Sequence, residues 1–508
     1  MRAATVAVAL LSTIGGTVVA TVARPDAAAP MTTAPSASSA TTLAWKRCHK
    51  SFQCATLTVP VDYTRPDGEQ VGIAVIRSPA LGANPSHRAL VLNFGGPGDA
   101  GTETLPYFVN GLPDEIRNAF DIVSFDPRGV GSSKPIRCIS AADADKLYSA
   151  DPTADTAAEL PAFYDGTAWP VDLEQGCIDR NGTWLAAVGT RNVARDLDRI
   201  RGALGNDTLD FVGFSYGTVI AAVYAQMYPE HVGHFVLDSP VNLSVTPEQE
   251  LINDANGFEY ALDAFLADCA ARAKCSFHSN RDPTSALRAL QQRFEQGLTL
   301  PGDTLSGDKR RVSVGDFYTA LISALYDKQY GWPNLADALH QATAHRDGSL
   351  LQSLADTYNG RRPNGTYDNI DEVIGIILCD DRFDVMSSYA AFVSLHDQLA
   401  AEYPFLGGYA GSAPVGCDPR LPRPPVSEEL GDVRVANAPP ALVIGTTDDP
   451  ATPYSGAQDV NDRWVGSRLL TFVSTEHTSY LKSACIDSAV DTYLLRGRLP
   501  VAGTRCQR

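Results

Sequence analysis

The sequence is short of positive charge. Its 508 residues contain 41 Lys and Arg against 59 Asp and Glu, which gives a formal net charge of -18. The cations form no basic stripe along the chain. Proteins bind nucleic acids chiefly through Lys and Arg contacts to phosphates. We therefore expect no nucleic-acid partner.

The sequence also lacks paired metal-binding cysteines and internal repeats. Ten cysteines occur, but no two of them form a C-x-x-C pair. This absence argues against a structural metal site, and we expect neither a metal nor another cofactor. No cysteine precedes Cys48, which excludes a lipid-acylated cysteine near the start.

The start of the chain is typical of an export signal. Arg2 precedes an apolar stretch at residues 3–20, and small residues follow it. We predict a signal peptide at 1–29 and a disordered spacer at 30–44, which is rich in Ala, Ser, Thr and Pro. A membrane anchor is the alternative, although Gly15 and Gly16 weaken it. After signal removal we expect a secreted monomer with no stable membrane insertion.

An exported chain with ten cysteines is expected to form disulfides. Sequence alone does not determine the pairing, and we favour bonds between near neighbours. The favoured pairs are Cys48 with Cys54, Cys138 with Cys177, Cys269 with Cys275, Cys379 with Cys417, and Cys485 with Cys506.

Two parts of the chain, residues 45–240 and 435–508, show apolar strand patterns separated by helical patterns. This alternation predicts a mostly parallel sheet with right-handed crossovers. Residues 241–434 show helical patterns with Gly and Pro breaks instead, so we expect an inserted helical lid. Eight strands are expected, at residues 54–63, 70–79, 89–94, 120–125, 209–212, 233–238, 440–445 and 468–474.

The turn Gly213-Phe214-Ser215-Tyr216-Gly217 separates a short apolar run from a helical pattern. This strand-turn-helix context predicts a nucleophile elbow, in which small neighbours let a strained corner expose the Ser215 hydroxyl. It also predicts an α/β-hydrolase fold with an eight-stranded sheet. A glycine turn that merely contains a serine is the alternative.

A serine hydroxyl needs a general base and a group that orients that base. In this architecture the partners follow in the order Ser, Asp, His, at the ends of later strands. His477 is the only histidine after the return to strand patterns. We predict Asp449 as the acid because Pro450 restrains its backbone, with Asp448 and then Glu476 as rivals.

An oxyanion formed at Ser215 requires preorganised backbone donors. Tyr216 N–H follows the nucleophile, and the glycine-rich loop after the strand at 89–94 offers a second donor. We predict Gly96 for this role.

Several segments together resemble one family, the exported actinobacterial tripeptidyl aminopeptidases, which are relatives of prolyl iminopeptidases. The resemblance covers nearly the whole mature chain and rests on NFGGPGDAG, FDIVSFDPRGVGSS, GFSYGT, DDPATPYSGA and EHTSYLKSAC. It implies that Ser215, Asp449 and His477 release short peptides, tripeptides in this family, from free N-termini through an acyl-enzyme. The chain departs from the pattern at Glu476, where relatives commonly carry Gly.

The expected substrates are peptides or small esters, because one elbow serves peptidases and esterases alike. A secreted carboxylesterase and a non-catalytic envelope or binding protein are the alternatives. In an aminopeptidase, the substrate ammonium needs a carboxylate partner when it is desolvated. We predict Asp381 and Glu248, ahead of Glu250 and Asp380.

Overall fold

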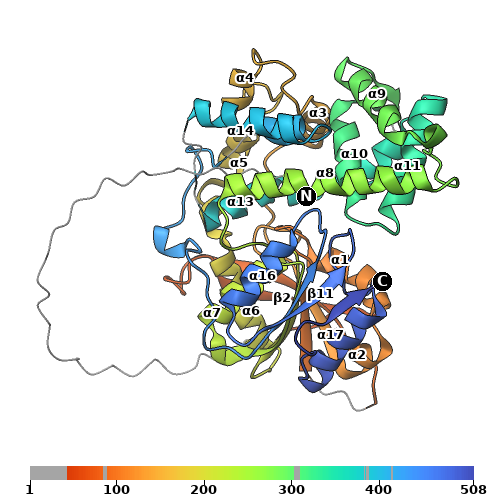
Figure 1. Ribbon diagram of the computed structural model, residues 1–508. Coiled ribbons are helices and arrows are strands. Elements are labelled where there is room, and N and C mark those ends of the chain that lie inside the picture. Colours follow the sequence, from red (N-terminus) through yellow and green to blue (C-terminus); the bar gives the residue numbers. More distant parts are fainter. Residues whose placement is uncertain (1–42, 84–87, 303–308, 383, 385–387, 414–415) are drawn as a thin grey trace, which may run out of the picture.

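The computed structural model describes residues 43–83, 88–302, 309–382, 384, 388–413 and 416–508. The predicted signal peptide at 1–29 and all but the last two residues of the predicted spacer lie outside the described residues. An α/β core forms the lower part of Figure 1, and a helical layer that we name the cap lies above it.

A mixed sheet forms the centre of the core. Its first three neighbouring pairs, from β1 to β5, are antiparallel, and all later pairs are parallel. In spatial order the strands are β1 (Lys46–Cys48), β2 (Phe52–Pro60), β3 (Gln70–Ser78), β5 (Phe120–Phe125), β4 (Arg88–Asn93), β6 (Leu209–Phe214), β7 (Val232–Asp238), β10 (Leu442–Thr446), β11 (Arg468–Val473) and β12 (Arg505–Gln507).

The sheet of the described residues has ten strands, so the predicted count of eight is wrong. The additional strands, β1 and β12, contain three residues each and lie at opposite edges. Such short segments carry no readable alternation of apolar residues. Each is held by a disulfide: Cys48 of β1 is bonded to Cys54 of β2, and Cys506 of β12 is bonded to Cys485.

Helices cover both faces of the sheet, as expected for parallel strands joined by crossovers (Figure 1). One apolar cluster joins one face to α6, α7 and α16, and another joins the opposite face to α1, α2 and α17. These core helices are α1 (Gly101–Phe108), α2 (Asp114–Ala119), α6 (Thr190–Ala203), α7 (Gly217–Met227), α16 (Tyr454–Arg463) and α17 (Ala484–Arg496).

The cap has its own apolar core, built mainly by α8 to α12. Its helices are α3 (Ala141–Ser149), α4 (Leu160–Tyr164), α5 (Leu173–Asn181), α8 (Pro247–Ala271), α9 (Pro283–Glu295), α10 (Val314–Leu325), α11 (Gly331–His340), α12 (Ser349–Tyr358), α13 (Ile370–Asp381), α14 (Tyr389–Glu402) and α15 (Gly407–Ser412), with a strand pair β8 (Leu300–Pro301) and β9 (Arg311–Val312). Short helical segments are the 3₁₀ helices η1 (Val109–Gly111), η2 (Gly182–Ala187), η3 (Pro229–His231), η4 (Ser279–Arg281) and η6 (Val426–Glu428), and the π-helix η5 (Gln341–His345).

The cap also recruits residues that the sequence assigned to the core at 45–240. Helix α3 packs against α10, and α4 packs against α14 and α15. The Ser313 hydroxyl donates to the Ser149 carbonyl at 2.7 Å, and Ala154 N–H donates to the Ser412 hydroxyl at 2.8 Å. The cap is therefore made from two separate insertions, after β5 and after β7.

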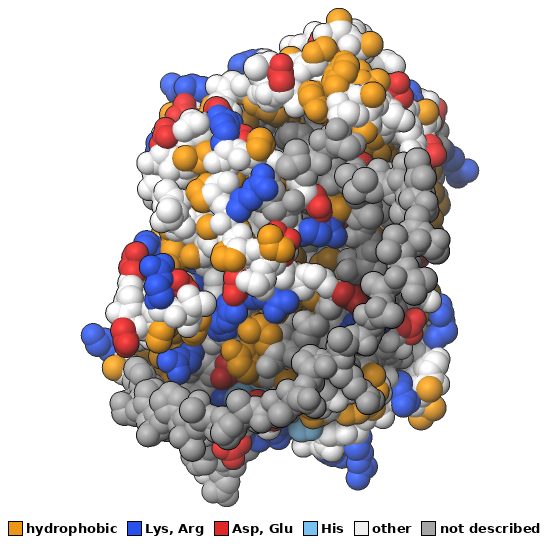
Figure 2. Space-filling view, turned by 90° about the vertical axis from the view of Figure 1, so that its left-hand side faces the viewer, with side chains coloured by type: hydrophobic (Ala, Val, Ile, Leu, Met, Phe, Trp, Pro, Cys, Tyr) orange, Lys and Arg blue, Asp and Glu red, His pale blue; other side chains and the backbone are white. Residues whose placement is uncertain are grey.

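Helix α8 crosses the cap directly above the core in Figure 1. On the face shown in Figure 2, Lys and Arg side chains are scattered among Asp and Glu rather than gathered in one area. Within the described ranges, no helix is both long and apolar enough to cross a membrane.

Five disulfides join all ten cysteines in the same pairs that the near-neighbour rule favours. The longest loops that they close span 39 and 38 residues. The bond from Cys379, in α13, to Cys417 lies in the second insertion, whereas Cys138 and Cys177 of α5 both lie in the first.

We predict that the mature protein contains no free thiol and loses stability in reductant. Each bond contributes about 2–4 kcal/mol in the chain-entropy view, so five exceed the usual margin of a domain. Thiol titration under denaturing, non-reducing conditions measures this. Two or more reactive thiols per chain would contradict the all-paired structure.

Candidate active site

Ser215 lies at a left-handed corner between β6 and α7. Its φ is 53°, a conformation that non-glycine residues adopt rarely. The corner fits only because its neighbours are small: a β-carbon at Gly217 would lie 2.7 Å from the Asn93 carbonyl oxygen, and one at Gly213 would overlap Gly217. The predicted strand-turn-helix geometry is therefore present at Ser215.

Backbone hydrogen bonds hold this corner in place. Ser215 N–H donates to the Asp238 carbonyl at the end of β7, at 3.0 Å. The Ser215 carbonyl accepts from the N–H and hydroxyl of Thr218, at 2.9 and 2.6 Å. The first turn of α7 thus begins immediately behind the serine, with its N–H groups directed toward the corner.

His477 follows β11 and is bonded to Asp449, which follows β10. His477 Nδ1 lies 2.8 and 3.1 Å from the two carboxylate oxygens of Asp449. Asp449 Oδ1 also accepts from Ala451 and Thr452 N–H, at 3.0 and 2.9 Å. Burial alone would raise the pKa of Asp449, but the adjacent His477 and these donors lower it below its ordinary value.

The two rival acids lie elsewhere. The carboxylate of Asp448 accepts from the Thr447 hydroxyl at 3.1 Å. Glu476 is fully buried, accepts from the Ser474 hydroxyl at 2.7 Å, and faces Lys482 at 3.6 Å. The structure thus brings Asp449 to His477 and directs both rivals to other partners.

Two residues that contact His477, Thr452 and Tyr326, were not predicted from the sequence to do so. The Thr452 hydroxyl lies 3.2 Å from His477 Nδ1. The backbone carbonyl of Tyr326, in the cap after α10, accepts from His477 N–H at 2.9 Å. The Tyr326 ring lies edge-on to the imidazole, with centroids 5.4 Å apart. A cap residue therefore helps to orient the predicted base.

The outer nitrogen of the imidazole remains available for chemistry. His477 Nε2 is buried and makes no hydrogen bond within the part of the chain that the structure describes. Such contacts are often long in substrate-free hydrolases and shorten in the reacting complex.

The loop that carries His477 is fixed to β7. The Asp238 carboxylate accepts from Ser479 N–H and hydroxyl at 3.0 and 2.8 Å, and from Tyr480 N–H at 2.8 Å. The neighbouring Ser239 hydroxyl accepts from Thr478 N–H at 3.0 Å. A polar pair directly after an apolar strand, as in VLDS, is the signal that could have revealed this role.

The predicted oxyanion donors lie on adjoining segments. A β-carbon at Gly95 would stand 3.0 Å from both Ser215 Cβ and Tyr216 N, so the glycine loop lies against the elbow. Gly95 N–H already donates to the Asn93 side chain at 3.1 Å. The next N–H along the loop is that of Gly96. The position of the loop agrees with the prediction that the N–H groups of Gly96 and Tyr216 both donate to one oxyanion.

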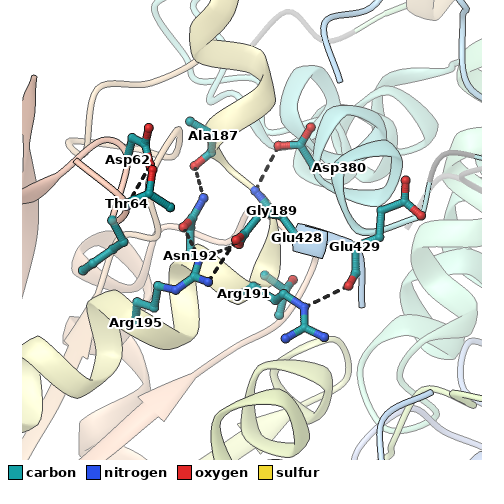
Figure 3. A network of polar contacts seen from close by, with 12 residues as sticks. Asp62, Thr64, Ala187, Gly189, Arg191, Asn192, Arg195, Asp380, Glu428 and Glu429 are labelled. Atoms are coloured by element: carbon teal, nitrogen blue, oxygen red, sulfur yellow. Dashed lines mark hydrogen bonds and ion pairs between the residues drawn. The ribbon is translucent and has the colours of Figure 1, made fainter. Parts of the chain in front are cut away.

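Asp381 does not fit the predicted role of binding a substrate amine. Its two oxygens accept from Thr190 N–H at 2.6 Å, from the Thr190 hydroxyl at 2.7 Å, and from the Tyr216 hydroxyl. Asp380 accepts from Val188 and Gly189 N–H, at 3.0 and 3.1 Å (Figure 3). Both carboxylates therefore bind protein groups at the start of α6 instead of facing a substrate.

The same junction ties the linker after the cap to α6. Arg191 donates to the Glu429 carbonyl at 2.8 Å, and Arg195 forms an ion pair with Glu428 at 2.6 Å (Figure 3). These contacts fill the surroundings of Asp380 with polar groups.

Two acidic residues on α8 are better placed than Asp381 to bind a substrate amine. Glu250 and Asp254 are one helical turn apart, and Gly257 continues the same face. A β-carbon at Gly257 would lie 2.5 Å from the Pro450 carbonyl oxygen, next to Asp449. This face of α8 therefore covers the acid of the site.

Burial raises the pKa of Glu250, with Arg382 opposing the shift. Burial, the Glu250 carboxylate and the more distant Asp449 raise the pKa of Asp254 well above its ordinary value. Glu248 lies in the first turn of the same helix and, like Glu250 and Asp254, is partly exposed. The pKa shifts thus single out Glu250 and Asp254, of which the sequence suggested only Glu250, as a lesser candidate.

Known proteins share both the core and the end of this chain. Residues 88–300 match the family described as the alpha/beta hydrolase fold, and residues 403–506 match the family described as TAP-like protein.

Three relatives cover most of the chain. A Mycobacterium tuberculosis protein named Serine protease Hip1 is 38% identical over 464 residues, covering 89% of this chain and 87% of its own. Carboxylesterase B from the same species is 35% identical, covering 90% and 86%. Tripeptidyl aminopeptidase of Streptomyces coelicolor is 30% identical, covering 90% and 83%. The chain belongs to the α/β-hydrolase family, with the TAP-like C-terminal region of these actinobacterial relatives, and is a serine hydrolase.

Proposed function

We propose that this protein is a secreted serine exopeptidase that releases short peptides, most simply tripeptides, from free N-termini. The observation that carries the proposal is the buried Asp449–His477 pair, whose loop is anchored to Asp238, the residue that also holds Ser215 N–H at its strained corner. Relatives named as a serine protease and as a tripeptidyl aminopeptidase support a peptide substrate.

In the proposed reaction, Ser215 Oγ attacks the carbonyl carbon while His477 Nε2 takes its proton. Asp449 holds the Nδ1–H tautomer and stabilises the imidazolium that forms. The N–H groups of Tyr216 and Gly96 donate to the tetrahedral oxyanion. His477 then protonates the leaving amine, and water hydrolyses the acyl-enzyme by the same steps in reverse.

We assign recognition of the substrate amine to Glu250 and Asp254, in place of Asp381. A buried ammonium needs an anionic partner, and two carboxylates of raised pKa gain most from a nearby cation. Their position on α8, over Asp449, would fix the distance from the amine to the scissile bond. The cap would thus set the length of the released peptide.

Ester hydrolysis and a non-catalytic envelope role are the two alternatives to the proposed peptidase function. A relative named Carboxylesterase B makes ester hydrolysis the second candidate, since the same elbow cleaves both bond types. A non-catalytic envelope protein would not need the assembled Asp449–His477 pair. The five disulfides favour the oxidising exterior and therefore the proposed secretion.

We predict that Ser215→Ala reduces turnover by ~10⁴-fold or more without changing the melting temperature, because the hydroxyl supplies chemistry and the glycines supply geometry. His477→Ala should behave in the same way. A fluorophosphonate probe should label the wild type and not the Ser215→Ala variant. An unlabelled, correctly folded wild type would favour the non-catalytic alternative.

We predict that Asp449→Asn lowers kcat by ~10⁴-fold, since the wrong tautomer of His477 would be held, whereas Asp448→Asn has a small effect. Steady-state kinetics on a tripeptidyl anilide compare the two matched variants. A larger loss in Asp448→Asn would show that the acid is misassigned.

We predict that N-acetylation of a tripeptidyl substrate lowers kcat/KM by about 100-fold, because the two α8 carboxylates lose their cationic partner. Asp254→Asn and Glu250→Gln should remove most of this difference by slowing cleavage of the free-amine substrate. Glu248→Gln, in the same helix, is the matched control and should keep it. If only Glu248→Gln removed the difference in kcat/KM between the free and acetylated substrates, Glu248 would be the residue that binds the substrate amine.

A further inference from the structure

A cavity of about 350 Å³ is lined by sequence neighbours of the site residues and has no role in the reaction described so far. Its walls include Phe94, Phe108 and Phe214 from the core and Tyr330 from the cap. It is large enough for a bulky amino-acid side chain.

Neither Ser215 nor His477 lines the cavity, but residues adjacent to them in the sequence do. Phe94 precedes the glycine loop, Phe214 precedes Ser215, and Thr478 follows His477. The leaving amine must receive its proton from His477, so the departing part of the substrate lies on the side of this loop. The cavity lies on that side, whereas Glu250 and Asp254 are on α8.

Aromatic side chains form one part of the cavity wall, and polar residues such as Gln329 and Thr478 form another. The rings of Phe94 and Phe214 are stacked with centroids 5.9 Å apart, and Phe108 lies edge-on to them at 5.1 and 5.4 Å. Tyr480 is buried and turns its hydroxyl away to Asp491, at 2.7 Å. These surfaces favour an apolar, preferably aromatic, occupant.

The two cations that line the cavity, Lys482 and Arg508, already lie close to carboxylates of the protein. Lys482 donates to the His477 carbonyl at 2.7 Å and lies 3.6 and 3.7 Å from Glu476 and Asp327. Arg508 lies 3.4 Å from Glu476. Paired cations offer little to a further carboxylate, so the aromatic walls are the selective element.

We propose that this cavity is the leaving-group subsite and takes the large apolar side chain of the residue that follows the scissile bond. The inference rests on the proposed function, because it assumes an acyl-enzyme at Ser215. It implies that Phe108 and Tyr330 help to select the residue that follows the scissile bond.

Capture of the acyl-enzyme by added amines tests the subsite. The acceptor nitrogen attacks the ester carbonyl, its proton passes to His477 Nε2, and the bond to Ser215 Oγ breaks as that oxygen takes the proton back. The product is a new amide, formed in competition with hydrolysis. The ratio of the two products is independent of the fraction of active enzyme.

With a tripeptidyl anilide as donor, phenylalaninamide should capture the acyl-enzyme about 10-fold or more better than glycinamide, the scale set by burying one aromatic side chain. Phe108→Ala and Tyr330→Ala should each reduce this preference severalfold. Tyr330 is 66% exposed, so its variant should fold even if Phe108→Ala does not. Tyr107→Ala is the matched control on α1, 86% exposed and not among the lining residues, and should keep the preference.

Equal capture of both amides by the wild type, or a preference that both variants retain, would overturn the subsite. Normal anilide cleavage together with either result leaves the proposed function intact. Absence of anilide cleavage would instead contradict the proposed function. The same partition measured with a short-chain nitrophenyl ester would then still test the cavity.

Discussion

One buried residue, Asp238, supports both halves of the site. Its carbonyl accepts from Ser215 N–H at the strained corner, and its carboxylate accepts from Ser479 and Tyr480 in the loop that carries His477. Burial raises the pKa of Asp238, and these donors oppose the shift. The predicted nucleophile and the predicted base are therefore positioned from the same strand end, so a displacement of β7 would disturb both at once.

The cap completes the site as well as covering it. The Tyr326 carbonyl holds His477 N–H, and Asp381 of α13 holds the Tyr216 hydroxyl beside Ser215. Helix α8 contacts the segment after Asp449 at Gly257. The predicted base thus contacts the cap directly, and the predicted nucleophile and acid each have a sequence neighbour, Tyr216 and Pro450, that does so. These contacts couple the docking of the cap to the geometry of the site. In the proposed account, the acidic pair on α8 recognises the substrate amine and the cavity next to Thr478 takes the leaving group.

The sequence was informative where a local pattern determines local geometry. The elbow could be predicted because Gly213 and Gly217 are required at a left-handed corner, and all eight long strands correspond to strands of the sheet. The α/β-hydrolase fold was confirmed by the family match. The three-residue edge strands, the contribution of α3 and α4 to the cap, and the contacts of Asp381 depend on long-range packing. No short pattern distinguishes a carboxylate that accepts from Thr190 and Tyr216 from one that faces a substrate.

The central claim is that this serine hydrolase acts on peptides from their free N-termini. The most direct measurement incubates the purified mature protein with a mixed peptide library and identifies the products by mass spectrometry. The account predicts a ladder of N-terminal tripeptides that arises only from peptides with a free amine. Internal cleavage at comparable rates, or an intact library together with rapid ester hydrolysis, would contradict it.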